Sequence, residues 1–170
     1  MSSEIPSFRV NGIITLEDLK KYGLLPPEER LKRGPVAIAE CPEKIPCNIC
    51  VDACPSGAIS MESIIELPVI DWEKCTGCSL CVSLCPGLAI FVVDLSPPDK
   101  ALVTVPHEFI PVPQRGDEVI LLSREGKRLG KGKVVRVYER NKTYAVTVEV
   151  PKEYAMEVRA IWVEKEEKNQ

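Results

Sequence analysis

The sequence predicts an α+β protein in which a duplicated strand–helix–strand module is followed by a small all-β barrel or sandwich. Three observations predict this class. A pattern of cysteines and prolines occurs twice, 31 residues apart, short β-type runs flank each copy, and four more β-type runs follow without a cysteine. We therefore divide the chain into an N-terminal arm (1–34), a duplicated module (35–95), a proline-rich connector (96–113), a β domain (114–164) and a solvated tail (165–170).

The N-terminal arm contains two short helical signals. Thr15 is in the position of an N-cap for a helix through LEDLKKYG, with Asp18 as the acidic partner of a capping box and Gly23 as the stop. Pro26 or Pro27 begins another helical turn. The arm is too short to build a core of its own, so we expect it to pack on the rest of the chain or on a partner.

The module that follows repeats its own pattern. The positions that match after a shift of 31 residues include Cys47 and Cys78, Cys50 and Cys81, Cys54 and Cys85, and Pro55 and Pro86. The β-type runs PVAIAE and PVIDWE precede the two cysteine clusters, and GAISM and LAIFVV follow them. Two strand–helix–strand halves that face each other across a pseudo-twofold axis are the simplest structure for such a repeat.

The sequence of the C-terminal part predicts strands. LSPPDK and VPHEFIPVP form the connector, and we expect His107, the only histidine, to lie on its surface. The runs EVILLS, KGKVVRVYE, TYAVTVEV and MEVRAIWVE then predict four strands. Four short strands can bury their apolar faces only by curling into a small barrel or sandwich.

Composition and charge favour a folded cytoplasmic protein. No apolar run approaches the ~20 residues of a membrane span, and the N-terminus lacks the basic and apolar stretches of a secretory signal. We therefore expect reduced thiols and no membrane span. The range from Cys41 to Asp94 contains seven acidic and two basic residues, whereas the range from Arg115 to Lys142 contains nine basic and four acidic residues. This contrast supports a boundary between the two regions.

The second cysteine cluster has the spacing C-x2-C-x2-C-x3-C-P, which is typical of iron–sulfur ligation. Two-residue gaps let the chain curl around one cluster, so that three thiolates reach three irons. The fourth cysteine lies one helical turn further on and faces a neighbouring cluster. Structural zinc favours separate C-x2-C pairs, and disulfides do not suit a reducing compartment. Zinc, disulfides and reactive catalytic thiols are therefore the weaker alternatives.

On these residues, the region from Pro35 to Val93 resembles a bacterial-type ferredoxin domain with two [4Fe-4S] clusters. The resemblance implies two ligand sets: Cys41, Cys47, Cys50 and Cys85 for cluster one, and Cys54, Cys75, Cys78 and Cys81 for cluster two. Cys41 departs from the family pattern, which has a cysteine where this chain has Lys44. The extra residues of the PEKIP loop can bulge outward and still return a thiolate. The alternative is a three-iron cluster or a differently ligated iron.

The resemblance implies an electron-transfer role and no catalytic residue in this chain, because such clusters move single electrons with little change in geometry. The arm and the β domain add docking surface that a free carrier does not need. The stretches GPVAIAECPEKIPCNIC and GDEVILLSREGKRLGKGKVVRV resemble the iron–sulfur subunits of multi-subunit flavin-dependent dehydrogenases, which oxidise amino acids such as proline or hydroxyproline, or glycerol 3-phosphate. Flavin-containing dehydrogenase subunits are therefore the expected partners in a hetero-oligomer.

Two other functions stay open: a free-standing ferredoxin carrier, and a redox-sensing protein that binds nucleic acid. The second would use the basic strip from Lys127 to Lys142 on phosphates. Charged turns and strand edges are ordinary in small β domains. In this region Tyr138 and Tyr144 are about the only aromatic residues that could stack on bases. Nucleic acid is therefore not the expected partner. No glycine-rich loop follows a strand and opens a helix, so we expect no nucleotide site.

Overall fold

The structure, a computed structural model, describes residues 5–164. It is mostly sheet, with one large antiparallel sheet, a second small sheet and short helices. The helices are α1 (Ser7–Asn11), α2 (Leu16–Lys21), α3 (Glu28–Leu31), α4 (Ile49–Ala53), α5 (Leu80–Leu84) and the 3-10 helix η1 (Lys152–Tyr154). The strands are β1 (Val36–Ala39), β2 (Ile59–Ser60), β3 (Val69–Ile70), β4 (Ile90–Asp94), β5 (Ala101–His107), β6 (Glu118–Ser123), β7 (Arg128–Arg140), β8 (Thr143–Val150) and β9 (Val158–Trp162). The predicted tail, 165–170, lies outside the described residues.

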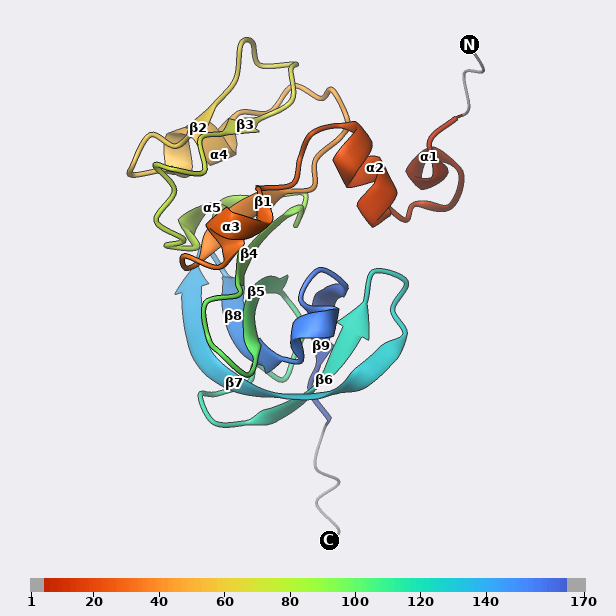
Figure 1. Ribbon diagram of the computed structural model, residues 1–170, viewed down its shortest axis with the longest axis vertical. Helices are drawn as coiled ribbons and strands as arrows, with labels where there is room; N and C mark the ends of the chain where they lie inside the picture. The colour runs from red at the N-terminus through yellow and green to blue at the C-terminus, as the bar shows by residue number, and fades with distance from the viewer. Residues whose placement is uncertain (1–4, 165–170) are drawn as a thin grey trace, which may run out of the picture.

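The large sheet has the strand order β1-β4-β5-β8-β7-β6-β9 and curls upon itself (Figure 1). Its neighbouring strands are antiparallel. The register of the long strand β7 shifts between Val134 and Arg136, and such irregularities bend and twist a sheet. As a result β5 contacts β9, the strand at the far end of the order. One apolar core, with residues from all seven strands, fills the interior.

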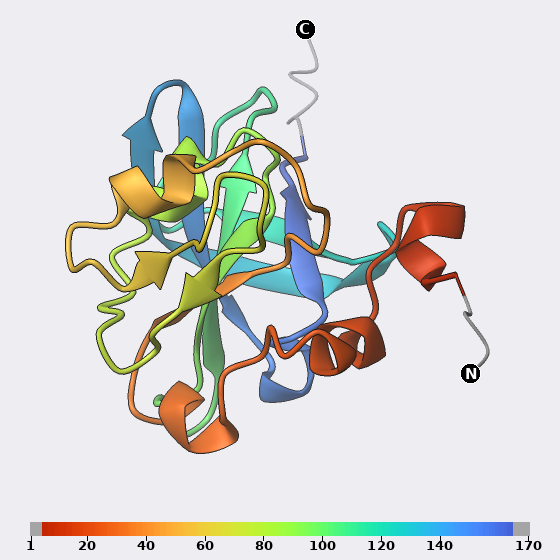
Figure 2. The ribbon, with the colours of Figure 1, turned by 90° about the horizontal axis from the view of Figure 1, so that it is seen from above.

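Strand β1, and strand β4 up to its last residue Asp94, are apolar, and every residue of both strands is buried. Val36 and Ile38 belong to the core inside the curled sheet, whereas Ala37 and Ala39 belong to a second apolar cluster. That second cluster also contains Val82 of α5 and residues of β2 and β3. Successive side chains of a strand point to opposite faces, so the cysteine-bearing segments stack on the outer face of these two strands (Figures 1 and 2).

The order strand, helix, strand occurs twice in the cysteine-bearing region, as β1-α4-β2 and as β3-α5-β4. The outer strands β1 and β4 pair with each other in the large sheet, and the inner strands β2 and β3 form the small sheet. Helices α4 and α5 are in contact. The two cysteine motifs therefore lie side by side over the large sheet.

The N-terminal arm packs on the rest of the chain, as expected. The predicted capping box is present: the Asp18 N–H donates to Thr15 Oγ1 at 3.1 Å, and the Thr15 N–H donates to the Asp18 carboxylate at 2.9 Å. Leu19 and Leu31 are buried, and the Leu95 N–H donates to the carbonyl of Leu31 at 2.9 Å. Helix α1 has no buried residue and stands away from the sheet (Figure 2).

The prediction that residues 96–113 form only a connector is wrong. Within it, Ala101–His107 is strand β5, which lies between β4 and β8. The prolines of this segment indicated a loop, but Pro106 lies beyond Thr104, the last residue of β5 that pairs with β4, and a missing N–H is tolerated where pairing ends. One sheet therefore joins strands from residues 35–95, 96–113 and 114–164.

The expected surface position of His107 is also wrong. This residue ends β5 and is only 3% exposed, and burial lowers its pKa. Its Nε2 lies 3.4 Å from the carbonyl oxygen of Pro111. His107 is therefore a packed residue of the sheet.

Candidate functional site

The eight cysteines gather around two cavities, with four in each group. One cavity is lined by Cys41, Cys47, Cys50 and Cys85, and the other by Cys54, Cys75, Cys78 and Cys81. All eight are free thiols. The structure thus brings together the same two sets that the resemblance implies, and their role as ligands stays a prediction. We call these spaces the first and second cysteine cavities.

Each cavity takes one cysteine from the other half of the repeat, and the helix ends explain how. Cys54 and Cys85 are the C-cap residues of α4 and α5, and both have extended backbone. The prolines that follow them disfavour a helical conformation at the preceding residue. The chain therefore leaves the helix at these two cysteines, and each thiol joins the cavity of the neighbouring motif.

Backbone N–H groups point at two of the sulfurs in the second cysteine cavity. The Ala37 N–H donates to Cys75 Sγ at 3.4 Å, and the Ala58 N–H donates to Cys54 Sγ at 3.3 Å. Burial alone raises the pKa of Cys54, but hydrogen bonds from Ser56 and from neighbouring backbone N–H groups outweigh it and lower that pKa. Donors of this kind stabilise the negative charge of a thiolate that binds metal.

The two most strongly perturbed thiols resist ionisation on their own. Burial, followed by the other cysteines of the same cavity, raises the pKa of Cys50 to about 11 and that of Cys81 to about 12. A cationic metal group supplies the charge that makes such thiols thiolates. Among residues 5–164, however, no three His, Cys, Asp or Glu side chains form a group that could hold a single metal ion.

Gly77 sets the shape of the second cysteine cavity, which it lines between Cys75 and Cys78. Its φ of +66° is in the left-handed region, and a Cβ there would lie 2.5 Å from Cβ and 2.7 Å from the carbonyl oxygen of Pro35. Both features require glycine. Because Pro35 directly precedes β1, this contact holds the cysteine loop against the large sheet.

We expect Gly77→Ala to lose about half of the bound iron, because only the second cavity is distorted. The measurement is iron content after anaerobic purification, with circular dichroism to show that the sheet is retained. Gly57 provides a matched control, since its φ is +62° and a Cβ at this position would have no atom within 4 Å. Its repeat equivalent, Leu88, has a side chain at φ +50°. Equal iron loss in Gly57→Ala would contradict the steric explanation.

The basic strip from Lys127 to Lys142 makes several contacts within the chain. Three of its side chains form surface ion pairs: Lys127 with Glu125, Lys131 with Glu118, and Arg128 with Glu164. A fourth, Arg136 of β7, donates from Nη2 to the carbonyl of Cys78 at 3.3 Å. Part of the strip therefore lies against the second cysteine cavity.

Two buried polar residues lie beside the cysteines, and no sequence pattern indicates their role. Arg30 of α3 donates to the carbonyl of Cys75 at 2.8 Å. Glu40 directly precedes Cys41 and accepts hydrogen bonds from Arg124 and Arg159. Each of these partners is at least 45 residues away in the chain. Local patterns give no indication of contacts at that separation.

The paired cysteine cavities have the donor atoms that iron–sulfur clusters of electron-transfer proteins use. Residues 40–89, which hold all eight cysteines, match the family model of the 4Fe-4S dicluster domain. The match supports an iron–sulfur domain of the ferredoxin type with a role in electron transfer, and it is consistent with two clusters. Searches of curated proteins and of solved structures gave no match. Within residues 5–164, no helix is long and apolar enough to cross a membrane.

Proposed function

We propose that this chain is an electron-transfer subunit that relays single electrons through two [4Fe-4S] clusters, either between flavin centres or from a flavin-containing dehydrogenase subunit to an acceptor. The observation that carries this proposal is the division of the eight cysteines into two sets of four, with Cys54 and Cys85 exchanged between the motifs. When bound, the clusters supply one-electron transfer with little structural change. The chain's own residues hold, space and shield them.

The topology supports a duplicated ferredoxin module as the origin of this arrangement. The repeated order β1-α4-β2 and β3-α5-β4, with outer strands paired and inner strands paired, is what a pseudo-twofold relation produces. The exchange of Cys54 and Cys85 follows from the same relation. Each five-residue helix, together with its C-cap residue, contributes a cysteine to both cavities, Cys50 and Cys54 from α4 and Cys81 and Cys85 from α5, so two bound clusters would be close enough to exchange electrons.

A permanent partner is supported by exposed apolar side chains around the first cysteine cavity. Ile45 lines that cavity and is 50% exposed. The Cys47 N–H donates to the carbonyl of Ile64 at 3.0 Å, so the exposed Ile64 is held close to the same site. Ile49, Ile65 and Val69 are exposed as well. Apolar surface of this kind marks interaction sites, and we propose that a flavin-containing subunit docks there.

Anaerobic purification of the native assembly tests both parts of the proposal. We expect about eight irons and eight sulfides per chain, magnetic coupling between two reduced clusters in electron paramagnetic resonance spectra, and a co-purifying flavoprotein. Colourless material that contains only zinc would overturn the cluster assignment. A full iron content without any associated flavoprotein would overturn the partner and leave the clusters in place.

Paired cysteine substitutions test how the ligands are divided. Cys54→Ala with Cys81→Ala removes two thiols from one cavity, so we expect about four irons to remain. Cys54→Ala with Cys50→Ala removes one thiol from each cavity, and we expect little iron in either. Cys41→Ala with Cys50→Ala examines the unusual loop in the same way and should keep about four irons. Iron content and resonance spectra of the three double variants are the measurements.

The three double variants together test whether Cys54 and Cys81 share one cavity, whether Cys50 belongs to the other, and whether Cys41 is separate from the second cavity. Four irons in the Cys54 and Cys50 variant would mean that Cys54 belongs to the first cavity, against the structure. Loss of all iron from the Cys41 and Cys50 variant would place Cys41 outside the first cavity or in a role that both clusters need. Alanine is used because serine oxygen can still bind iron.

A further inference from the structure

The two cysteine cavities differ in the charged side chains that lie beside them. Arg30 and Arg136 each donate a hydrogen bond to the carbonyl of a cysteine that lines the second cavity. The acceptors are Cys75, at 2.8 Å from Arg30 Nη2, and Cys78, at 3.3 Å from Arg136 Nη2. Among residues 5–164, neither guanidinium forms an ion pair with a carboxylate. Two positive charges without an ion-pair partner therefore lie beside the second cavity.

Acidic residues near the second cavity offset these charges only in part. Glu73 pairs instead with Arg33 on the exposed surface. Asp94 lines a small cavity together with Arg136, but the two form no ion pair. Arg30 is only 8% exposed, so solvent screens its charge weakly, whereas Arg136 is exposed and is screened more. The second cavity thus keeps an excess of positive charge.

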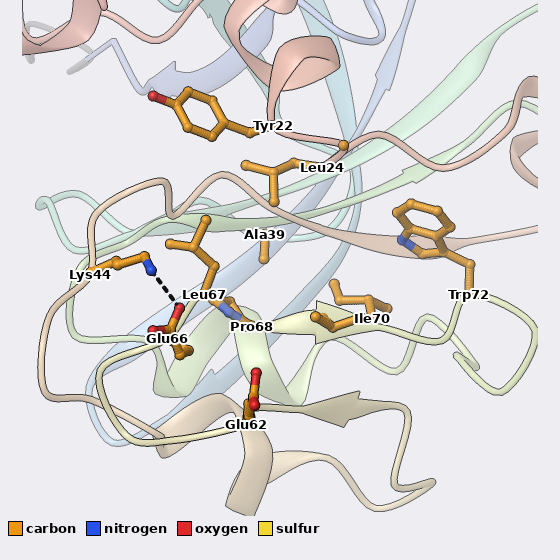
Figure 3. Close-up of a pocket in the computed structure, with 12 residues that line it drawn as sticks. Tyr22, Leu24, Ala39, Lys44, Glu62, Glu66, Leu67, Pro68, Ile70 and Trp72 are labelled. Carbon is orange, nitrogen blue, oxygen red and sulfur yellow. Dashed lines mark ion pairs between the residues drawn. The ribbon is translucent and has the colours of Figure 1, made fainter.

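The first cysteine cavity is lined by carboxylates and by no guanidinium group. The carboxylates are those of Glu43 and Glu66. Glu66 also lines a larger cavity of about 570 Å³, which lies between the N-terminal arm and the segment that leads into β3 (Figure 3). Glu43 pairs with Arg9 at 3.2 Å, and Glu66 pairs with Lys44 at 2.7 Å. Each carboxylate is therefore balanced by one base, and no positive charge is left over.

The buried ion cluster next to Cys41 does not change this contrast. Its two guanidinium groups, those of Arg124 and Arg159, pair with Glu40, and Glu157 lies 4.0 Å from Arg124. Two bases and two acids cancel in net charge. The member that directly precedes Cys41 is the acid, Glu40.

Reduction of an iron–sulfur cluster adds one negative charge, which neighbouring positive groups favour. The N–H groups of Ala37 and Ala58, which donate to sulfurs of the second cavity, act in the same direction. We infer that Arg136, together with the buried Arg30, raises the reduction potential at the second cavity above that at the first. This inference rests on the proposed function, and it gives the electron relay a direction.

The direction agrees with the exposure of the two cavities. With a flavin-containing subunit docked beside Ile45, as proposed above, an electron enters at the first cavity and settles at the second. Cys78, which lines the second cavity, is the most exposed of the eight cysteines. The end of the relay is therefore also the place where an acceptor can approach a ligand from solvent.

Redox titration of the double cysteine variants tests the order of the two potentials. Cys41→Ala with Cys50→Ala leaves the second cavity intact, and Cys54→Ala with Cys81→Ala leaves the first intact. Each variant is titrated anaerobically with dithionite and viologen mediators at low ionic strength and followed by electron paramagnetic resonance. We expect reduction at the higher potential in the variant that keeps the second cavity. Equal potentials, or the reverse order, would overturn the inference.

Arg136→Gln, introduced into both double variants, tests the cause, because glutamine keeps an amide donor but not the charge. At the second cavity we expect the equilibrium constant for reduction to fall about threefold to tenfold, roughly 28–59 mV for one electron. At the first cavity we expect a change of less than about twofold. Arg136→Lys keeps the charge and should restore most of the potential, which it would not do if the role of Arg136 were only structural.

Lys131→Gln is the matched control for Arg136→Gln. Lys131 is an exposed base on the same strand, pairs with Glu118 and lines neither cysteine cavity, so its loss should shift neither potential. An unchanged potential at the second cavity in Arg136→Gln, or equal shifts at both cavities, would overturn the inference and leave the proposed function in place. The expected order of potentials in a chain without a flavoprotein partner would overturn only that partner. A chain without iron–sulfur clusters would overturn both.

Discussion

Replacing Glu40 by alanine should cost about 3–5 kcal/mol of stability, because it leaves two buried guanidinium groups without their shared counter-ion. The Glu40 carboxylate accepts from Arg124 at 2.6 and 2.7 Å and from Arg159 Nε at 2.8 Å. All three side chains are at most 6% exposed. Burial already lowers the pKa of Arg159 to about 10, while the attraction of Glu40 opposes that shift.

The position of this ion cluster in the fold explains why the effect should be large. Glu40 directly follows β1 and Arg159 lies in β9, and these strands are the two ends of the large sheet. Arg124 also donates to the carbonyl of Met156 at 2.8 Å, before β9, and to that of Ile14 at 3.4 Å in the arm. The cluster therefore closes the curled sheet on the side of the first cysteine cavity, next to Cys41.

The measurement is the midpoint of anaerobic thermal unfolding, followed by circular dichroism and by visible absorption. For a chain of this size, a loss of that magnitude lowers the midpoint by roughly 6–20 °C. Lys131→Ala is the matched control, because its pair with Glu118 is exposed on both sides and should leave the midpoint nearly unchanged. Similar midpoints for the two variants would contradict the role of Glu40. The triple change Glu40→Met, Arg124→Met and Arg159→Leu should be less destabilising than Glu40→Ala, since it leaves no buried charge unpaired.

Local and repeated patterns in the sequence predict much of this fold. The strands Glu118–Ser123 and Thr143–Val150 coincide with the predicted runs, because a short apolar run in the first and apolar alternation in the second are properties of the strand itself. The grouping of the eight cysteines could also be expected, because the resemblance to a ferredoxin domain implies the same two sets of four. Because the two halves of the repeat align at a shift of 31 residues, Cys54 and Cys85 are equivalent positions, and each is expected to join the cavity of the other half.

Features that depend on distant partners could not be predicted. β5 pairs with β8 more than 30 residues later, and its prolines resemble those of a connector. Glu40 lies 119 residues before Arg159, and the sequence around it indicates only an exposed acidic residue. The large cavity forms only where the arm crosses the segment before β3. Each of these depends on how the sheet curls, and that curl is set by irregular register in β6 and β7.

Arg30 should be the most sensitive residue of the N-terminal arm. Its guanidinium donates to four backbone carbonyls: Trp72 at 2.6 Å, Cys75 at 2.8 Å, Gly34 at 3.1 Å and Pro35 at 3.3 Å. Two of these acceptors precede β1, and the other two are Trp72 and Cys75, in the loop that brings Cys75 to the second cysteine cavity. Arg30 thus joins the same two segments that meet at Gly77.

We expect Arg30→Ala to destabilise the chain by about 3 kcal/mol or more and to lose iron from the second cavity first. Hydrogen bonds from a charged donor contribute about 1.5–3 kcal/mol each, and their loss leaves carbonyls without partners. Arg30→Lys should give an intermediate result, because lysine keeps the charge but not the planar fork. Iron content and the unfolding midpoint are the measurements.

Arg33→Ala provides the control for Arg30, because Arg33 lies on the same arm and pairs with Glu73 on the exposed surface. It should keep full iron content and leave the unfolding midpoint nearly unchanged. If Arg30→Ala lost iron from both cavities equally, the arm would support the whole domain and not one cavity. If it lost none, the four carbonyl contacts would not be needed to hold the loop. Selective loss, with four irons left in the first cavity, is the outcome that the contacts of Arg30 require.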